Sequence, residues 1–300
     1  MIAMAVHGGA GLLPLDLLEA HRGGCRAALQ LGLDVLGSGG SALDAVQRAV
    51  IALENDETFD AGYGSFLNRD GHVECDAGIM DGARLATGTV CAVSGVPNPV
   101  VLARAILESP LAVLVAGGAR DFAVEQGVDV CDPEQLVSPR ARRLWDEHGD
   151  RGWNAADDRS LFGDTVGAVA LDERGDLAAA TSTGGMPGKP PGRVGDSPFI
   201  GTGVYANNAS AAVSTTGHGE LIIPFVWAKS AADLITSGMA TEGAARRSIQ
   251  LLAPTMAKGG LIMVDQRGMP AVGWNTPHMA FAYLDPSTGD IVDGPRMSSP

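Results

Sequence analysis

The chain has 300 residues, and its 21 lysines and arginines against 35 aspartates and glutamates give a formal net charge of −14. This balance argues against a protein that binds nucleic-acid phosphates or an anionic membrane surface, because both need an electropositive face. Hydrophobic residues make up 45 % of the chain, enough for a sizeable core, and 41 glycines indicate many tight turns. The length is compatible with two domains or with one large unit.

The amino terminus, MIAMAVHGGAG, has no basic segment before its apolar run, which ends at His7, so it does not resemble a signal peptide. No stretch approaches the roughly 18 apolar residues of a membrane span. The cysteines show no CxxC spacing, which predicts reduced thiols in the cytoplasm rather than disulfides or a zinc site. They are Cys25, Cys75, Cys91 and Cys131.

Apolar patterning predicts the elements of the first half of the chain. In order, they are a strand at 2–6 that runs into an HGGAG loop, helices at 16–36 and from Ser41, strands at 73–80 and 87–94, and helices at 99–108 and 119–127 around a short strand, LAVLV. Ser41 and Asp44 have the spacing of a capping box. Residues 132–164 are charged and lack periodicity, which favours a mobile linker or an ordinary surface excursion.

After residue 164 the strand pattern returns, and TVGAVALD and DLAAATST flank a turn at Glu173-Arg174-Gly175. The remaining predicted elements are strands near 200–205 and 210–216, helices near 222–237 and 240–252, and strands near 260–265, 270–275 and 278–284. Strands and helices come in blocks rather than in strict alternation. We therefore expect a layered α+β fold, with two sheets packed on each other and helices outside.

The predicted hairpin has a geometric consequence. A three-residue loop with Gly175 in the left-handed conformation pairs Asp172 with Asp176. Counting back along both strands places Thr165 opposite Thr183, so that two hydroxyls face each other directly after a polar segment. Such a pair is either an ordinary cross-strand contact or part of a reactive site.

Two glycine-rich segments carry further polar groups. In PGRVGDS, Arg193 can bind a carboxylate and Asp196 an ammonium, which together suit a free amino-acid group. The alternative is a surface salt bridge between these two residues. The strand ASAAVSTT runs into Gly217-His218-Gly219, where a hydroxyl and bare amides suit an oxyanion hole, although an ordinary glycine-rich turn has the same pattern.

Taken together, these motifs resemble a known family. GDTVGAVALD, ATSTGGMPGKPPGRVGDSP and ANNASAAVSTTGHGE are similar to the small subunit of plant-type L-asparaginases, also called isoaspartyl peptidases. VHGGAG, SALDAV and FDAGYGSFLNRDGHVECDAGIMDG match the first half, so the resemblance runs from residue 5 to about residue 283. These enzymes are N-terminal-nucleophile hydrolases, which implies a single domain over residues 1–300 with a four-layer αββα sandwich.

The resemblance implies that the chain is made as a precursor and cuts itself between Asp164 and Thr165, into 1–164 and 165–300. The Thr165 hydroxyl attacks the preceding carbonyl, and water opens the resulting ester. The freed α-amine of Thr165 titrates near pH 8, at about the working pH. It can therefore act as the base for its own hydroxyl, and the reaction needs no cofactor.

The other site residues also follow from the resemblance. Thr183 supports the nucleophile, and Arg193 binds the substrate α-carboxylate, while Asp196 and the Gly219 carbonyl hold the α-ammonium. Thr216 and the Gly217 amide form the oxyanion hole. Gly8 contributes a backbone contact, His7 orders its loop, and His218 lies beside the substrate without moving a proton. A structural sodium ion is bound by the backbone carbonyls of Leu53, Glu54, Asp56, Phe59, Ala61 and Tyr63.

The chain departs from the family pattern at two positions. Asp60 stands in FDAG where the family has FNAG, and an ionised aspartate only accepts hydrogen bonds, whereas asparagine also donates. Asp164 stands where the nearest relatives have glycine and resembles the glycosylasparaginase branch. We expect both residues to affect self-cleavage.

The resemblance predicts a dimer of αβ heterodimers that hydrolyses amides on the β-carboxyl of aspartate, in isoaspartyl dipeptides and in L-asparagine. One alternative is a threonine hydrolase of the glycosylasparaginase or taspase kind. Another is a non-catalytic binding protein that never cleaves itself, and Asp60 is the residue that favours this alternative. A nucleotide-binding module is disfavoured because HGGAG lacks the GxGxxG spacing.

Overall fold

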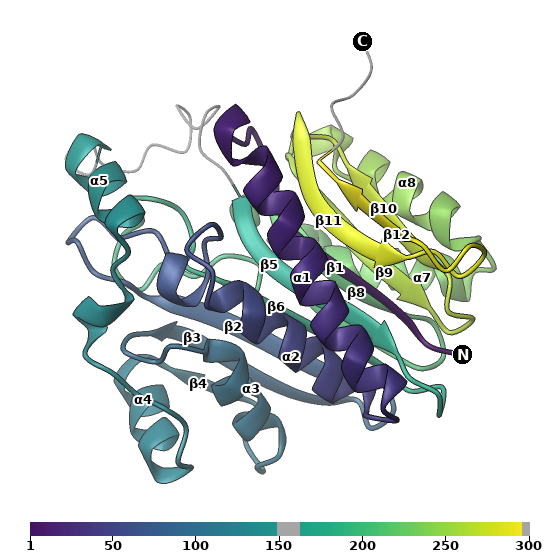
Figure 1. Cartoon of the computed structure of the whole chain (residues 1–300), viewed down its shortest axis with the longest axis horizontal. Coiled ribbons are helices and arrows are strands. Elements are labelled where there is room, and N and C mark those ends of the chain that lie inside the picture. The colour runs from purple at the N-terminus through teal and green to yellow at the C-terminus, as the bar shows by residue number, and fades with distance from the viewer. Residues whose placement is uncertain (149–162, 296–300) are drawn as a thin grey trace.

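The computed structural model describes residues 1–148 and 163–295, which form two β-sheets with helices on their outer faces (Figure 1). The large sheet contains, in spatial order, β12 (Ile291–Gly294), β11 (His278–Leu284), β1 (Ala3–Gly11), β5 (Gly163–Leu171), β6 (Leu177–Thr183), β2 (Cys75–Asp81), β3 (Ala86–Val93) and β4 (Val113–Val115). The small sheet contains β10 (Pro270–Trp274), β9 (Gly259–Asp265), β8 (Ala211–Gly217) and β7 (Val204–Ala206). Neighbouring strands are antiparallel except for β3 and β4.

The helices lie on both outer faces of this pair of sheets. They are α1 (Leu18–Gly37), α2 (Ala42–Glu54), α3 (Pro99–Leu107), α4 (Ala116–Glu125), α5 (Pro139–His148), α6 (Gly219–Ile222), α7 (Trp227–Thr236) and α8 (Thr241–Leu251). Helices α1, α2 and α3 pack on the large sheet, and α7 and α8 pack on the small one. Among the described residues, none of these helices has the length and apolar character that crossing a bilayer requires.

Alternating side chains divide each central strand between two cores. On β1 and β5, Ala5 and Val169 point toward the small sheet and pack with Ile262 between the sheets. Met4 and Ala168 point the other way, into the core beneath α1 and α2. The order of layers is therefore helix, sheet, sheet, helix, as expected from the block pattern of the sequence.

Local signals account for how α2 begins and how α1 continues. The Ser41 hydroxyl accepts a hydrogen bond from the backbone N–H of Asp44 at 3.0 Å, as the sequence predicts for a helix start. Helix α1 runs through the Gly23-Gly24 pair without interruption. A Cβ on Gly24 would lie 2.6 Å from the Phe59 ring, so this glycine allows a loop to pack directly against the helix.

The structure differs from the predicted linker over residues 133–148. A 3-10 turn at Pro133–Leu136 precedes α5, which begins after Ser138, whose hydroxyl accepts the N–H of Ala141 at 3.1 Å. The indole N–H of Trp145 donates to the carbonyl of Asn68 at 2.9 Å. The apolar pattern did not reveal this helix because half of its residues are charged. Residues 149–162, the rest of the predicted linker, lie outside the described residues.

Two other differences concern strands. The HGGAG segment was expected to be a loop, but it continues β1, so Gly8 lies within a strand. Strand β12 was not predicted, since its four residues pair only with β11 at the edge of the sheet.

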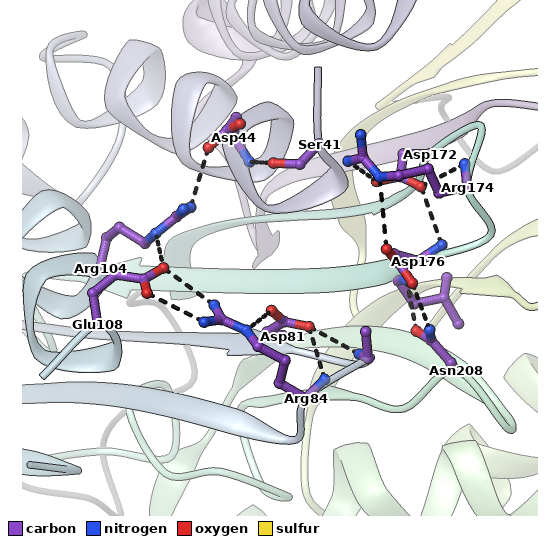
Figure 2. A network of polar contacts seen from close by, with 12 residues as sticks. Ser41, Asp44, Asp81, Arg84, Arg104, Glu108, Asp172, Arg174, Asp176 and Asn208 are labelled. Carbon is purple, nitrogen blue, oxygen red and sulfur yellow. Dashed lines mark hydrogen bonds and ion pairs between the residues drawn. The ribbon is translucent and has the colours of Figure 1, made fainter. Parts of the chain in front are cut away.

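A polar network joins the β5–β6 hairpin to α2 (Figure 2). The buried carboxylate of Asp172 accepts hydrogen bonds from the N–H groups of Ala42, the first residue of α2, at 3.0 Å and of Arg174 and Asp176 at 2.9 and 3.1 Å. A carboxylate at a helix N-terminus also interacts favourably with the helix dipole. Asp172 therefore links the second half of the chain to the first.

The rest of the network is more exposed. Arg84 lies between Asp81 and Glu108 and is half exposed, with hydrogen bonds of 2.6 Å to the former and 3.1 and 3.2 Å to the latter. Ion pairs of this kind contribute little to stability, because water already solvates both partners.

We predict that Asp172→Ala lowers the free energy of unfolding by about 2–3 kcal/mol, because it leaves buried N–H groups without acceptors. Glu108→Ala, in the exposed part of the same network, should change it by less than about 1 kcal/mol. Urea unfolding of both variants tests this. Equal losses in the two variants would contradict the assignment.

Candidate active site

The hairpin has the predicted register. Val166 lies opposite Ser182 and Leu171 opposite Leu177, and Gly175 adopts a positive φ of 85° in the turn. One position further along, the Thr165 hydroxyl donates a hydrogen bond to the Thr183 hydroxyl at 3.0 Å. The predicted meeting of the two threonines is confirmed, and both side chains are buried.

The backbone around Thr165 is irregular. The pairing of β1 with β5 is regular up to Gly8 and resumes at Ala10, and the one residue between them faces both Asp164 and Thr165. This is the pattern of a β-bulge, in which one strand carries an extra residue and its side chains are re-aimed. Gly9 supplies the matching positive φ of 98° on β1. The Asp164–Thr165 peptide bond thus lies within a bulge.

His7 lies beneath the threonine pair. Its Nε2 is 2.8 Å from the Ser214 hydroxyl, which in turn is 2.7 Å from the Thr181 hydroxyl. Burial lowers the pKa of His7 to about 3, although a hydrogen bond with the Thr165 backbone acts in the opposite direction. The ring is therefore neutral. A Cβ on Gly167 would lie 2.5 Å from His7 Nε2, so only glycine fits there. His7 lies in a strand rather than in the expected loop, and its contact with Ser214 was not predicted.

The Asp164 carboxyl is buried between two helices. One oxygen is 3.5 Å from an Nη2 of Arg140 on α5, and the other is 3.8 Å from Nε2 of His21 on α1. This second oxygen, Oδ1 of Asp164, and Nε2 of His21 have no hydrogen-bond partner among the described residues. His21 is itself fixed, because Nδ1 lies 2.9 Å from the Leu17 carbonyl. The residue before Thr165 is therefore held through its side chain.

Asp60 lies beside the second threonine. Its carboxylate accepts the N–H of Phe66 at 2.8 Å, and its carbonyl accepts the N–H of Gly184 at 2.9 Å. A Cβ on Gly184 would lie 2.3 Å from the Asp60 carboxyl, so the two are in close contact. Burial raises the pKa of Asp60 to about 7, and the Asp164 charge adds to the shift. Asp60 thus lies against Gly184, the residue that follows Thr183.

Arg193 forms an ion pair that the sequence did not predict. Its Nε and Nη2 donate to the two oxygens of Glu220, each at 2.8 Å. The alternative of a salt bridge between Arg193 and Asp196 is wrong. Glu220 comes from the first turn of α6, 27 residues away in sequence, so spacing alone offered no signal for it.

Asp196 instead faces β8 and α6. It accepts a hydrogen bond from the Thr215 hydroxyl at 3.1 Å, and a Cβ on Gly219 would lie 2.9 Å from its Oδ1. Burial raises the pKa of Asp196 to about 6, while Thr215 and the positive charge of Arg193 lower it. Asp196 and Gly219, which were predicted to act together, are thus in contact.

The predicted oxyanion residues lie at the end of β8. Thr216 is buried, and Gly217 has a φ of 146°. A Cβ on Gly217 would lie 2.3 Å from the Lys258 carbonyl, so the close approach of β9 requires glycine. The next residue, His218, places Nε2 3.8 Å from the Glu220 carboxylate.

The predicted sodium loop is tightly wound around the 3-10 turn Gly62–Gly64. A Cβ on Gly62 would lie 2.5 Å from the Glu54 carbonyl oxygen, so this carbonyl points into the loop. The Glu54 side chain is already used, because it accepts hydrogen bonds from Val100 and Asn98 at the start of α3. The Glu54 carboxylate is therefore engaged at the start of α3. The described residues contain no cluster of three or more His, Cys, Asp or Glu side chains able to hold a metal.

The sequence also missed a buried ion pair beside Thr183. Lys189 is fully buried, and its Nζ donates to the Glu74 carbonyl at 2.8 Å and lies 3.9 Å from an oxygen of Asp76. Asp76 lies directly opposite Thr183 in the β2–β6 ladder. Burial raises the pKa of Asp76, and the charge of Lys189 opposes that shift.

Comparison with known proteins agrees with this geometry. Residues 1–292 match a family model described as asparaginase. The chain belongs to the asparaginase family. The resemblance of the sequence motifs to plant-type L-asparaginases is thus confirmed.

Several relatives in the asparaginase family cover nearly the whole chain. The chain is 44 % identical over 306 residues to the isoaspartyl peptidase/L-asparaginase of Homo sapiens, covering 97 % of this chain and 99 % of that protein. It is 42 % identical over 283 residues to the protein of the same name from Xenopus laevis, with coverages of 94 % and 91 %. It is 41 % identical over 311 residues to the isoaspartyl peptidase of Escherichia coli strain K12, with coverages of 95 % and 95 %.

We predict that Lys189→Met lowers the free energy of unfolding by about 3–5 kcal/mol, because it leaves the buried Asp76 charge uncompensated. The matched control is Lys229→Met, which removes an exposed pair with Asp233 and should cost less than about 1 kcal/mol. Denaturant unfolding followed by circular dichroism measures both. Similar values for the two variants would show that the buried pair does not stabilise the fold.

Proposed function

We propose that this protein is a self-cleaving hydrolase of β-aspartyl amide bonds that acts on isoaspartyl dipeptides and L-asparagine through an N-terminal threonine, Thr165. The observation that carries the proposal is the 3.0 Å hydrogen bond from the Thr165 hydroxyl to the Thr183 hydroxyl, beside a bulged peptide bond. The names of the relatives support the same substrates.

Self-cleavage comes first. The Thr165 hydroxyl oxygen attacks the Asp164 carbonyl carbon, the C–N bond breaks, and the nitrogen takes up the hydroxyl proton. The Asp164 acyl group is then an ester on Thr165, and water hydrolyses it to a carboxylic acid and the free hydroxyl. Before this step the Thr165 nitrogen is an amide and cannot act as a base. Afterwards it is an amine that can.

Substrate hydrolysis repeats the same chemistry. The Thr165 amine accepts the proton of its own hydroxyl as the oxygen attacks the β-carbonyl of the substrate. Thr216 and the Gly217 N–H stabilise the oxyanion, and the leaving amine takes the proton. Water then releases aspartate from the ester.

The rest of the site recognises the aspartyl group. Arg193 binds its α-carboxylate, while the Asp196 carboxylate and the Gly219 carbonyl hold its α-ammonium. The contact between Asp196 and Gly219 supports this pairing. These groups contact only the aspartyl part of the substrate. Isoaspartyl dipeptides and asparagine therefore use the same site and differ only in the leaving amine. We expect dipeptides to be preferred.

The mature protein consists of chains 1–164 and 165–300, which fold as one N-terminal-nucleophile domain and pair into a dimer of heterodimers. Strand β5 supports this arrangement, because it remains bonded to β1 after the cut. The carbonyls of the 53–63 loop bind a structural sodium ion, and catalysis uses no cofactor. The four cysteines are free thiols, which supports a reducing compartment such as the cytoplasm.

We predict that the purified protein splits into two fragments at Asp164–Thr165 and then hydrolyses β-aspartyl dipeptides and L-asparagine. Thr165→Ala should remain a single chain without activity, because it lacks the nucleophile. Intact mass under denaturing conditions, before and after incubation, measures the cut, and ammonia or amino-acid release measures hydrolysis. A wild-type chain that stays whole and inactive would refute the proposal.

The two departures from the family pattern should change the rate of the cut. Asp164→Gly removes the side chain held by Arg140 and should slow self-cleavage about tenfold, equivalent to about 1.4 kcal/mol in the barrier. Asp60→Asn restores the amide donor of the family and should accelerate it. Timed mass spectra follow both variants. Rates equal to wild type would remove Asp60 and Asp164 from the self-cleavage step.

The pH dependence of substrate binding should follow Asp196. Its pKa is raised to about 6, and only the ionised form attracts the substrate ammonium. As the pH falls through 6, the carboxylate is protonated, and kcat/KM for L-asparagine should fall about tenfold per pH unit. Asp196→Asn should have low kcat/KM and lose this acid limb. An unchanged acid limb in that variant would assign the titration to another group.

A further inference from the structure

The ion pair between Arg193 and Glu220 has a specific geometry. Both hydrogen bonds are 2.8 Å long and run from Nε and Nη2 to separate carboxylate oxygens. Arg193 is 12 % exposed and Glu220 35 %, so the pair is partly withdrawn from water. The ion pair between Arg193 and Glu220 is therefore stronger and more directional than the exposed ion pairs elsewhere on the surface.

A guanidinium group offers two edges to a carboxylate, one made of Nε and one Nη, the other made of both Nη atoms. Glu220 occupies the first edge. Among the described residues, Nη1 of Arg193 makes no hydrogen bond, and Nη2 has only a further 3.4 Å contact with the sulfur of Met186. Nη1 lies beside Gly195, where an added Cβ would come within 3.1 Å of it. In the described residues Nη1 is therefore left for another acceptor, and it lies beside a residue that has no side chain.

Glu220 lies in the first turn of α6, and His218 Nε2 is 3.8 Å from its Oε2, too far for a hydrogen bond. Burial raises the pKa of Glu220, but the hydrogen bonds from Arg193 outweigh burial, so that the pKa lies below its ordinary value and the group stays ionised. Glu220 can thus accept both hydrogen bonds of Arg193 as a carboxylate.

We propose that Glu220 is a positioning residue for substrate recognition, which holds one edge of Arg193 so that the Nη1–Nη2 edge faces the α-carboxylate of the aspartyl substrate. The proposal rests on the proposed function, in which Arg193 binds that carboxylate. A long arginine side chain loses rotamer freedom when it binds a ligand. Glu220 removes that freedom before the substrate arrives, and preorganisation of this kind increases affinity.

The opposite arrangement would have Glu220 compete with the substrate for Arg193. The two arrangements predict opposite changes in KM. If Glu220 positions Arg193, its removal weakens binding. If Glu220 competes, its removal strengthens binding.

The test compares Glu220→Ala and Glu220→Gln with wild type on L-asparagine and on a β-aspartyl dipeptide. We expect Glu220→Ala to raise KM at least tenfold for both substrates and to change kcat less than about threefold. Glu220→Gln, which keeps the size and one acceptor oxygen, should lie between. The control is Glu242→Ala, which removes an exposed partner of Arg246 in the first turn of α8 and should leave KM unchanged.

A double-mutant cycle separates positioning from a general structural effect. In an Arg193→Ala background, Glu220→Ala should cause no further rise in KM, because the group through which it acts is gone. A fall in KM in Glu220→Ala, an unchanged KM, or the same rise in both backgrounds would overturn the proposal.

Calorimetric titration of the reaction product, L-aspartate, distinguishes failure of this proposal from failure of the proposed function. Wild-type protein that hydrolyses neither substrate would refute the proposed function. Even in that case, the positioning role of Glu220 predicts that Glu220→Ala binds L-aspartate at least tenfold more weakly than wild type. Equal binding by the two proteins, or no binding by wild type, would refute the role of Glu220.

Discussion

The candidate site depends on the position of β5 between β1 and β6 in the large sheet. In a sheet, a shift of one residue turns every side chain to the opposite face, so the register decides whether Thr165 meets Thr183. That register is set at the Gly175 turn, about 20 Å along the strand from the threonines. Asp172 holds this turn to the start of α2. A network at one end of the hairpin thus supports the threonine pair at the other.

The same strand carries two conflicting demands, which the bulge reconciles. In the proposed self-cleavage, Thr165 is fixed by sheet pairing, yet the peptide bond before it must be open to attack. Regular antiparallel pairing would engage that bond in the ladder. The irregularity between Gly8 and Ala10 interrupts the ladder only at Asp164 and Thr165. Pairing with β1 is present on both sides, so the strand stays in place while these two residues have no regular partner on β1.

The sequence predicted those parts of the site that depend on local signals. The turn at Glu173-Arg174-Gly175 was enough to pair Thr165 with Thr183. The positive φ of Gly175 and the strand period carry that information over short distances. The pairing of Arg193 with Glu220 and the burial of Lys189 could not be predicted, because they depend on how loops pack on other elements. The roles of the remaining residues came from family resemblance, and they stay predictions.

The two departures from the family pattern are physically connected, although 104 positions separate them in the chain. Arg140 approaches the Asp164 carboxylate with one nitrogen and donates to the Thr58 carbonyl at 2.9 Å with another. Thr58 is two residues from Asp60, and the charge of Asp164 helps to raise the pKa of Asp60. A change at either aspartate therefore alters the electrostatic environment of the other. The effects of Asp60→Asn and Asp164→Gly on the rate of self-cleavage should not add, because groups that share a partner are coupled. Helix α5, which the sequence pattern did not reveal, supplies that shared partner.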